Sequence, residues 1–137
     1  MLRSLRRGFL ALAIAPIIAV CATPLFAASP AGDEPETVMI TLRAKAGAED
    51  ALKQVIVTHW DTVRRLKMVR DDAPHLTLQG KDEAGHAYFV DIFTWRDARF
   101  PDAAPPEVQT IWKDMNALVE PRSGRPGLEI TEMTPVR

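Results

Sequence analysis

The chain has 137 residues with 17 basic and 18 acidic side chains, which gives a formal net charge of −1. This length fits one domain of ordinary size, and the charge lacks the basic excess typical of nucleic-acid-binding domains. A single cysteine excludes an internal disulfide and a metal site built from several cysteines. We therefore expect a domain held by its core or by oligomerisation, without a nucleic-acid partner.

The beginning of the chain resembles a secretory signal peptide. Arg3, Arg6 and Arg7 precede an apolar run that starts at Phe9, and small residues follow at 27–29. The arginine pair also resembles a twin-arginine export signal. An uncleaved membrane anchor is the alternative, although the run is near the lower length limit for a membrane span.

These features divide the chain into a signal peptide at 1–28, a flexible lead-in at 29–36 and one domain at 37–137. We predict export by the twin-arginine or general secretory route, to the periplasm. Cleavage of the leader would leave 14 basic and 18 acidic side chains, a net charge of −4, and no stable membrane insertion.

The first half of the domain predicts a strand followed by a helix. Residues 38–43 alternate between apolar and polar side chains, which is typical of a strand. Gly47 precedes a helix with acids in its first turn and bases near its end, as the helix dipole favours. The apolar stripe of that helix contains Leu52, Val55, Ile56, His59, Val63 and Leu66.

The second half predicts a hairpin, a helix and a last strand. Residues 75–79 and 88–95 alternate around a polar turn, and the second run is rich in aromatic and β-branched residues. Pro105 and Pro106 introduce another helix, and residues 128–133 form the last strand. The apolar stripe of this second helix contains Val108, Ile111, Trp112, Met115 and Val119.

This order predicts an α+β, ferredoxin-like βαββαβ fold, in which a four-stranded antiparallel sheet carries both helices on one face. We expect the helix-covered face to hold Val38, Ile40, Leu42, Leu76, Leu78, Tyr88, Val90, Ile92, Leu128 and Ile130. We expect the opposite face to hold Met39, Thr41, His75, Thr77, Phe89, Asp91, Phe93, Trp95 and Met133. Because that face is also apolar, two chains are predicted to pack sheet to sheet as a homodimeric barrel.

The chain resembles the antibiotic biosynthesis monooxygenase-like domains of the dimeric α/β-barrel superfamily. The resemblance lies in residues 42–50 after the opening strand, in Phe93-Thr94-Trp95, and in the helix after Pro105-Pro106-Glu107-Val108. It implies a homodimer that binds a small organic molecule between helices and sheet. Some members oxidise quinol-like aromatics with oxygen and no metal or flavin, whereas others cleave haem. The haem-cleaving branch uses a histidine that the helix at 106–120 lacks, so we predict no cofactor.

His59 is the catalytic candidate, because it lies within the apolar stripe of the first helix and would face the sheet. An imidazole there could bind a phenol or take a proton near neutral pH. The alternative is a neutral core histidine with a hydrogen-bond partner. The predicted substrate-binding residues are Trp112, Tyr88, Trp60 and Met115, although aromatic residues also fill cores and dimer seams.

His75 and Asp91 are predicted to lie opposite each other as a polar pair on the barrel face. A carboxylate can orient an imidazole and raise its pKa, but the pair could equally satisfy two buried polar groups. The three histidines lack metal-ligand spacing, so no metal is predicted.

Two functions follow from the sequence. The first, which the resemblance and the positions of His59 and Trp112 imply, is an exported protein that binds a small organic ligand, with cofactor-independent monooxygenation of a small aromatic or quinone-like compound as its reaction. The alternative is a non-catalytic periplasmic binding or structural protein of the same fold, because no compact catalytic motif is present.

Overall fold

The computed structural model describes residues 34–136, and the predicted order of elements is confirmed there. The strands are β1 (Glu36–Arg43), β2 (Leu76–Lys81), β3 (Ala87–Trp95) and β4 (Leu128–Met133), and the helices are α1 (Glu49–Arg65) and α2 (Pro106–Ala117). The predicted signal peptide at 1–28 lies outside the described residues. Within the described part of the chain, no helix has the length and apolar character needed to cross a membrane.

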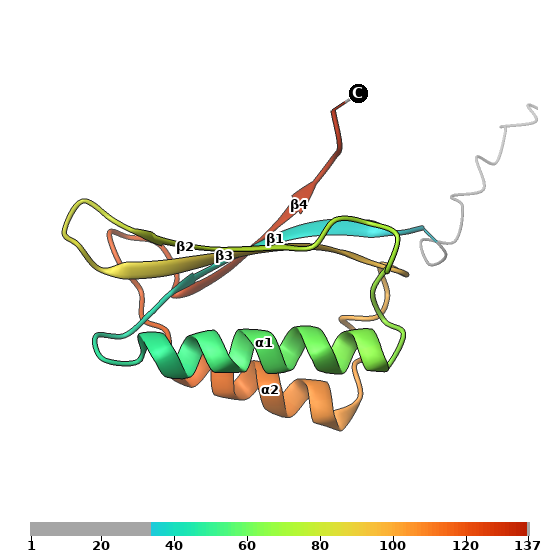
Figure 1. Ribbon diagram of the computed structural model, residues 1–137, viewed down its shortest axis with the longest axis horizontal. Coiled ribbons are helices and arrows are strands. Elements are labelled where there is room, and N and C mark those ends of the chain that lie inside the picture. The colour runs from blue at the N-terminus through green and yellow to red at the C-terminus, as the bar shows by residue number, and fades with distance from the viewer. Residues whose placement is uncertain (1–33, 137) are drawn as a thin grey trace, which may run out of the picture.

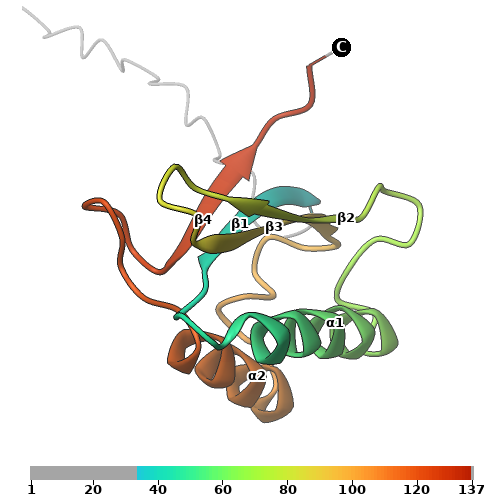
Figure 2. The ribbon, with the colours of Figure 1, turned by 60° about the vertical axis from the view of Figure 1, so that its left-hand side comes forward.

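The four strands form one antiparallel sheet in the order β2-β3-β1-β4. Both helices lie on the same side of this sheet and pack against each other (Figures 1 and 2). This arrangement confirms the ferredoxin-like α+β fold for the single chain. The strands at the two edges, β2 and β4, are the more exposed ones.

Local sequence explains where the helices begin and end. Glu49 and Asp50 lie in the first turn of α1, and Arg64 and Arg65 lie in its last turn. At these positions each charge interacts favourably with the helix dipole. Lys67 then adopts a φ of 59°, a left-handed conformation that turns the chain away from the helix axis. Helix α2 begins at a proline, whose missing N–H costs nothing in the first turn.

The predicted face of β1 is correct, but the predicted faces of β2 and β3 are reversed. Val38, Ile40 and Leu42 are buried beneath the helices, and their direct partners on β3 are Phe93, Asp91 and Phe89 in that order. Because directly paired residues share a face, the odd-numbered residues of β3 point toward the helices. Strand β3 is apolar on both faces, so its alternation alone could not show which face is covered.

The reversal places a different set of side chains on the side of the sheet away from the helices. We call this side the open face; it comprises Met39, Thr41, Leu76, Leu78, Tyr88, Val90, Ile92, Thr131 and Met133. Leu76 and Leu78 are 47% and 51% exposed, and Met133 is 41% exposed. The face is therefore a broad apolar surface without cover from the described chain.

Candidate functional site

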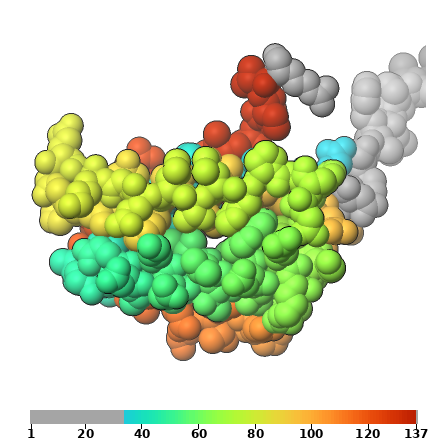
Figure 3. Space-filling model, viewed as in Figure 1, coloured from blue at the N-terminus to red at the C-terminus, as the bar shows by residue number. Residues whose placement is uncertain are grey.

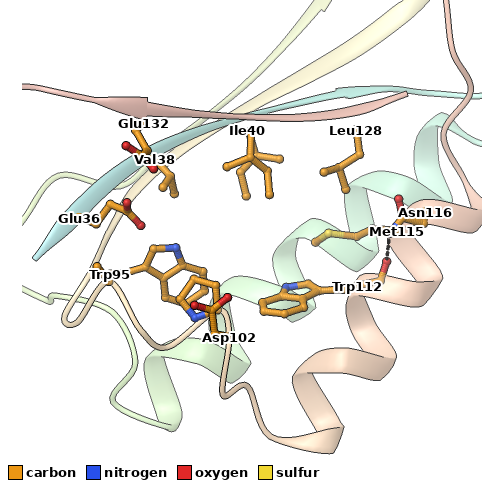
Figure 4. A pocket seen from close by; sticks show the side chains of 13 residues that line it. Glu36, Val38, Ile40, Trp95, Asp102, Trp112, Met115, Asn116, Leu128 and Glu132 are labelled. Carbon is orange, nitrogen blue, oxygen red and sulfur yellow. Dashed lines mark hydrogen bonds between the residues drawn. The ribbon is translucent and has the colours of Figure 1, made fainter. Parts of the chain in front are cut away.

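The main pocket lies between the β1–β4 half of the sheet and helix α2, with a volume of about 400 Å³. Val38, Ile40 and Leu128 point down from the sheet, while Trp112 and Met115 rise from α2 to face them (Figure 4). A volume of this size accommodates a small organic ligand. The remaining lining residues are Glu36, Trp95, Ala98, Pro101, Asp102, Asn116, Ile130 and Glu132.

Two indole rings form the aromatic wall of this pocket. Trp95 ends β3 and Trp112 lies one turn before Asn116 on α2; their ring centroids are 6.5 Å apart in an edge-to-face arrangement. Trp95 also packs edge-to-face on the buried Phe93, at 4.8 Å between centroids. These contacts fix the rings in a geometry that aromatic pairs favour, so the wall is preformed.

His59 lies behind this wall and does not line the pocket. Its side chain is fully buried, and its Nε2 accepts a hydrogen bond of 3.1 Å from Trp112 Nε1. Because an indole N–H only donates, Nε2 must be unprotonated, and the neutral imidazole carries its hydrogen on Nδ1. Nδ1 has no hydrogen-bond partner among the described residues. His59 therefore acts on the pocket through Trp112 and not by direct contact.

Burial keeps this imidazole neutral. The pKa of His59 is lowered from its ordinary value of 6.5 to about 4, mainly by desolvation; Asp91 partly opposes this shift, and His75 adds a smaller lowering. At neutral pH the ring is thus a fixed hydrogen-bond acceptor for Trp112.

Three carboxylates form one end of the pocket. Glu36, Glu132 and Asp102 surround the Trp95 end, whereas Met115 and Asn116 lie at the other end (Figure 4). The pKa of Glu36 is raised, first by partial burial and then by the neighbouring Glu132 and Asp102. No local sequence pattern indicates this acidic end, because its members come from β1, β4 and the loop before α2.

The predicted His75–Asp91 pair is present, but it lies on the helix side of the sheet and not on the barrel face. His75 Nε2 is 2.9 Å from Asp91 Oδ1, and Thr77 Oγ1 donates to the same oxygen at 2.6 Å. Trp60 stacks on the His75 ring with a centroid distance of 3.6 Å. Thr77, not His75, is the direct partner of Asp91 in the sheet. The reversed face of β3 explains the correction.

This second polar cluster lies beside a separate groove. The groove runs between α1 and the edge strand β2, where the surface is hollowed (Figure 3), and it has a volume of about 300 Å³. Thr77 and Phe89 contribute to its lining. Phe93 lies between the cluster and His59, with ring centroids 6.2 Å from Trp60 and 5.7 Å from His59.

The structure divides the predicted substrate-binding residues among different places. Trp112 and Met115 line the main pocket, and Trp60 stacks on His75 outside it. Tyr88 points to the open face and lines a hollow beside Arg43 and Arg122, so its predicted place under the helices is wrong. The sequence pattern predicts Trp95 on the opposite face, yet it is buried under the helices and lines the pocket. The correct register between β3 and β1 would have identified Trp95 as a residue of the helix-covered face.

A metal centre has no support in the described residues. Within 34–136, no three histidine, cysteine, aspartate or glutamate side chains are grouped so that they could hold a metal ion. The pocket is instead apolar over most of its wall, with carboxylates at one end and the Asn116 amide at the other. The Asn116 amide donates to the Trp112 carbonyl at 3.0 Å.

The described part of the chain shares its fold with solved structures of small single-domain proteins. It is similar to SnoaB, a cofactor-independent oxygenase from Streptomyces nogalater. One SnoaB structure, of a mutant, gives a TM-score of 0.56 at 19% identity over 75% of this chain and 94% of that chain. A second gives 0.52 at 17% identity over 76% and 95%.

Rv0793 from Mycobacterium tuberculosis is also similar, with a TM-score of 0.51 at 14% identity over 76% of this chain and 97% of that chain. Identities this low establish the fold alone. No family model matches the sequence, and a search of curated proteins gives no match.

Proposed function

We propose that this protein binds a small aromatic or quinone-like compound in the main pocket and oxidises it with dioxygen, without a metal or organic cofactor. The observation that carries the proposal is the preformed wall of Trp95 and Trp112, with Trp112 held from behind by the buried His59. Support also comes from the fold, which is shared with a protein described as a cofactor-independent oxygenase.

A quinol can supply all the electrons that this reaction needs. One atom of dioxygen enters a ring C–H bond, and the other leaves as water with the two phenolic hydrogens, so a hydroxyquinone forms. The carboxylates of Glu36, Glu132 and Asp102 are the lining groups that can accept a phenolic proton. The raised pKa of Glu36 brings that carboxyl closer to the operating pH of a general base.

His59 is a positioning residue in this proposal. Its hydrogen bond fixes the indole of Trp112 and occupies the ring N–H, so a ligand meets the apolar face of the indole. The apolar wall excludes water from the ring that is oxidised.

Oxygen uptake with a panel of hydroquinones tests the proposal. The protein should consume oxygen faster than buffer, and His59→Leu should lower kcat/KM by about tenfold because Trp112 loses its acceptor. His59→Gln offers a carbonyl acceptor to the same N–H and should restore part of the rate. Lys113→Ala, on the exposed side of α2, is the matched control and should leave the rate unchanged.

Uptake no faster than buffer across the panel, and equal in His59→Leu, would refute the oxygenase proposal. Saturable ligand binding without turnover would then favour the alternative, a non-catalytic binding protein. The largely apolar pocket is compatible with either function.

We also propose that two chains associate through their open faces. Leu76, Leu78 and Met133 expose a large part of their apolar surface there, together with the less exposed Val90 and Ile92. Burial of this surface against a second copy would be favourable by about 25 cal/mol per Å². A face-to-face dimer leaves both main pockets accessible, because each pocket lies on the helix side.

Export is proposed from the leader alone. The arginines and the apolar run at 3–20 support a cleaved signal, and they lie outside the described residues. Expression of the full chain in a bacterium, followed by N-terminal sequencing of the periplasmic fraction, should give a mature start near residue 28 or 29. Retention of the intact leader in the membrane fraction would contradict this.

A further inference from the structure

The charged groups that line the main pocket are all acidic. Glu36, Asp102 and Glu132 carry the only formal charges among its thirteen lining residues, and no lysine, arginine or histidine is among them. The rest of the wall is apolar or aromatic, apart from the amide of Asn116. The pocket therefore combines a largely apolar wall with an acidic end, where Glu36 is partly buried and Asp102 and Glu132 are exposed to solvent.

The sheet register forces two of these carboxylates together. Glu132 pairs directly with Val38 across β1 and β4, and Glu36 lies two residues before Val38 on the same face. The two side chains point toward each other above Trp95 (Figure 4). Like charges on neighbouring side chains destabilise each other, and the pKa of Glu36 is raised first by desolvation and then by Glu132 and Asp102. A cation placed between them would relieve this repulsion.

The neighbouring wall also suits a cation. Trp95 lies beside the carboxylates and lines the same space (Figure 4). The face of an indole ring attracts an ammonium group, and the attraction is larger where water is excluded. A ring on the apolar side of the pocket could thus rest near Trp112 and Met115 while an attached ammonium group lies at the acidic end.

We propose that the ligand of this pocket is an arylalkylamine in its protonated form, with its ring in the apolar part and its ammonium group among Glu36, Glu132 and Asp102. This inference rests on the proposed function only in placing the ligand in the main pocket. It names the charge of the ligand and holds whether or not the ligand is oxidised. A carboxylate or phosphate on the same ring would meet three negative groups and is selected against.

Three phenols that differ only at the end of one side chain test this charge preference. Tyramine carries an ammonium group, tyrosol a neutral hydroxyl and 4-hydroxyphenylacetate a carboxylate. Isothermal titration calorimetry on the mature protein at low salt should show tyramine binding about tenfold more tightly than tyrosol. 4-Hydroxyphenylacetate should bind more weakly than tyrosol.

The double variant Glu36→Gln with Glu132→Gln should remove most of the tyramine preference and leave the affinity for tyrosol within about twofold. Removal of two repelling charges should not unfold the protein, and thermal melting checks this. The matched control is Asp61→Asn with Glu83→Gln, which changes the net charge equally at exposed positions away from the pocket. That control should keep the preference.

Equal affinity for the three phenols, tighter binding of 4-hydroxyphenylacetate, or no binding of tyramine at millimolar concentration would overturn the inference. A preference that survives in the Glu36→Gln, Glu132→Gln variant would also overturn it, because the charge would act from elsewhere. Tyramine binding without oxygen uptake on the catechol analogue dopamine would support this inference while counting against the oxygenase. Turnover of neutral quinols without any preference for amines would support the oxygenase proposal and overturn this inference.

Discussion

At the residue scale, the central feature is a buried imidazole that supports the pocket from behind. The side chain of His59 is completely buried and accepts one hydrogen bond, from Trp112. Its position in an apolar stripe suggested contact with either a ligand or the core. The structure places it in the core, one side chain away from the pocket, so its influence on a ligand depends on the indole between them.

The lowered pKa of His59 predicts a specific loss of stability in acid. The unfolded chain binds a proton on this imidazole below pH 6.5, whereas the folded chain does so only below about pH 4. Stability from this group is therefore present above pH 6.5 and is lost as the pH falls toward 4, by about 3 kcal/mol in total. Denaturant unfolding at several pH values should show a steeper acid loss in the wild type than in His59→Gln.

His86→Gln is the matched control for this measurement, because His86 lies in the exposed turn between β2 and β3. It should keep the wild-type dependence on pH. Identical slopes in the wild type and in His59→Gln would show that the imidazole is not held neutral by the fold.

At the element scale, the loop that carries α2 into β4 determines where the pocket closes. Gly127 is buried, and its carbonyl accepts a hydrogen bond of 2.7 Å from the backbone N–H of Arg43 at the end of β1. This contact joins the start of β4 to β1 beside the pocket residue Leu128. The close approach of the loop backbone leaves no space for a side chain at residue 127.

Gly127→Ala is expected to destabilise the protein by about 2 kcal/mol. A methyl group there would lie 2.8 Å from backbone atoms of Glu120, which cannot move without shifting the loop. Gly80→Ala is the comparison: its methyl group would meet only the end of the Tyr88 ring, at 2.6 Å, and that ring can rotate away on the open face. Chemical denaturation of both variants should show the larger loss for Gly127→Ala, and the opposite order would contradict the argument.

At the scale of the whole molecule, the apolar open face predicts the oligomeric state. Light scattering of the mature domain at micromolar concentration should give twice the monomer mass. Leu78→Arg places a charge in the middle of an edge strand on this face, at a side chain that is 51% exposed in the single chain. The variant should be monomeric and still folded, because the burial of a charge is costly only in the dimer.

Val57→Arg serves as the control, since Val57 is 48% exposed but belongs to α1 on the helix side. It should remain dimeric. A clean monomer for the wild type, or an equal effect of both substitutions, would refute association through the open face.

The sequence by itself determined the order and type of the elements. Periods of two and of three to four residues are local properties of strands and helices, and they can be counted along 38–43 or 49–65 without knowledge of the rest. The inward positions of His59, Trp112 and Met115 followed from the same counting, because a helix has one apolar stripe.

Only the tertiary structure decided which side chains of β3 face the helices and the pocket. This strand is apolar on both faces, so its pattern is compatible with either orientation, and a shift of one residue moves every side chain to the other face. Pairing of Val38 with Phe93 and of Ile40 with Asp91 selected one orientation. That choice brought Trp95 into the pocket, placed Asp91 beneath α1 and moved Tyr88 outward. The acidic end of the pocket likewise arose only when distant strands paired, because electrostatic neighbours depend on distance in space and not on separation along the chain.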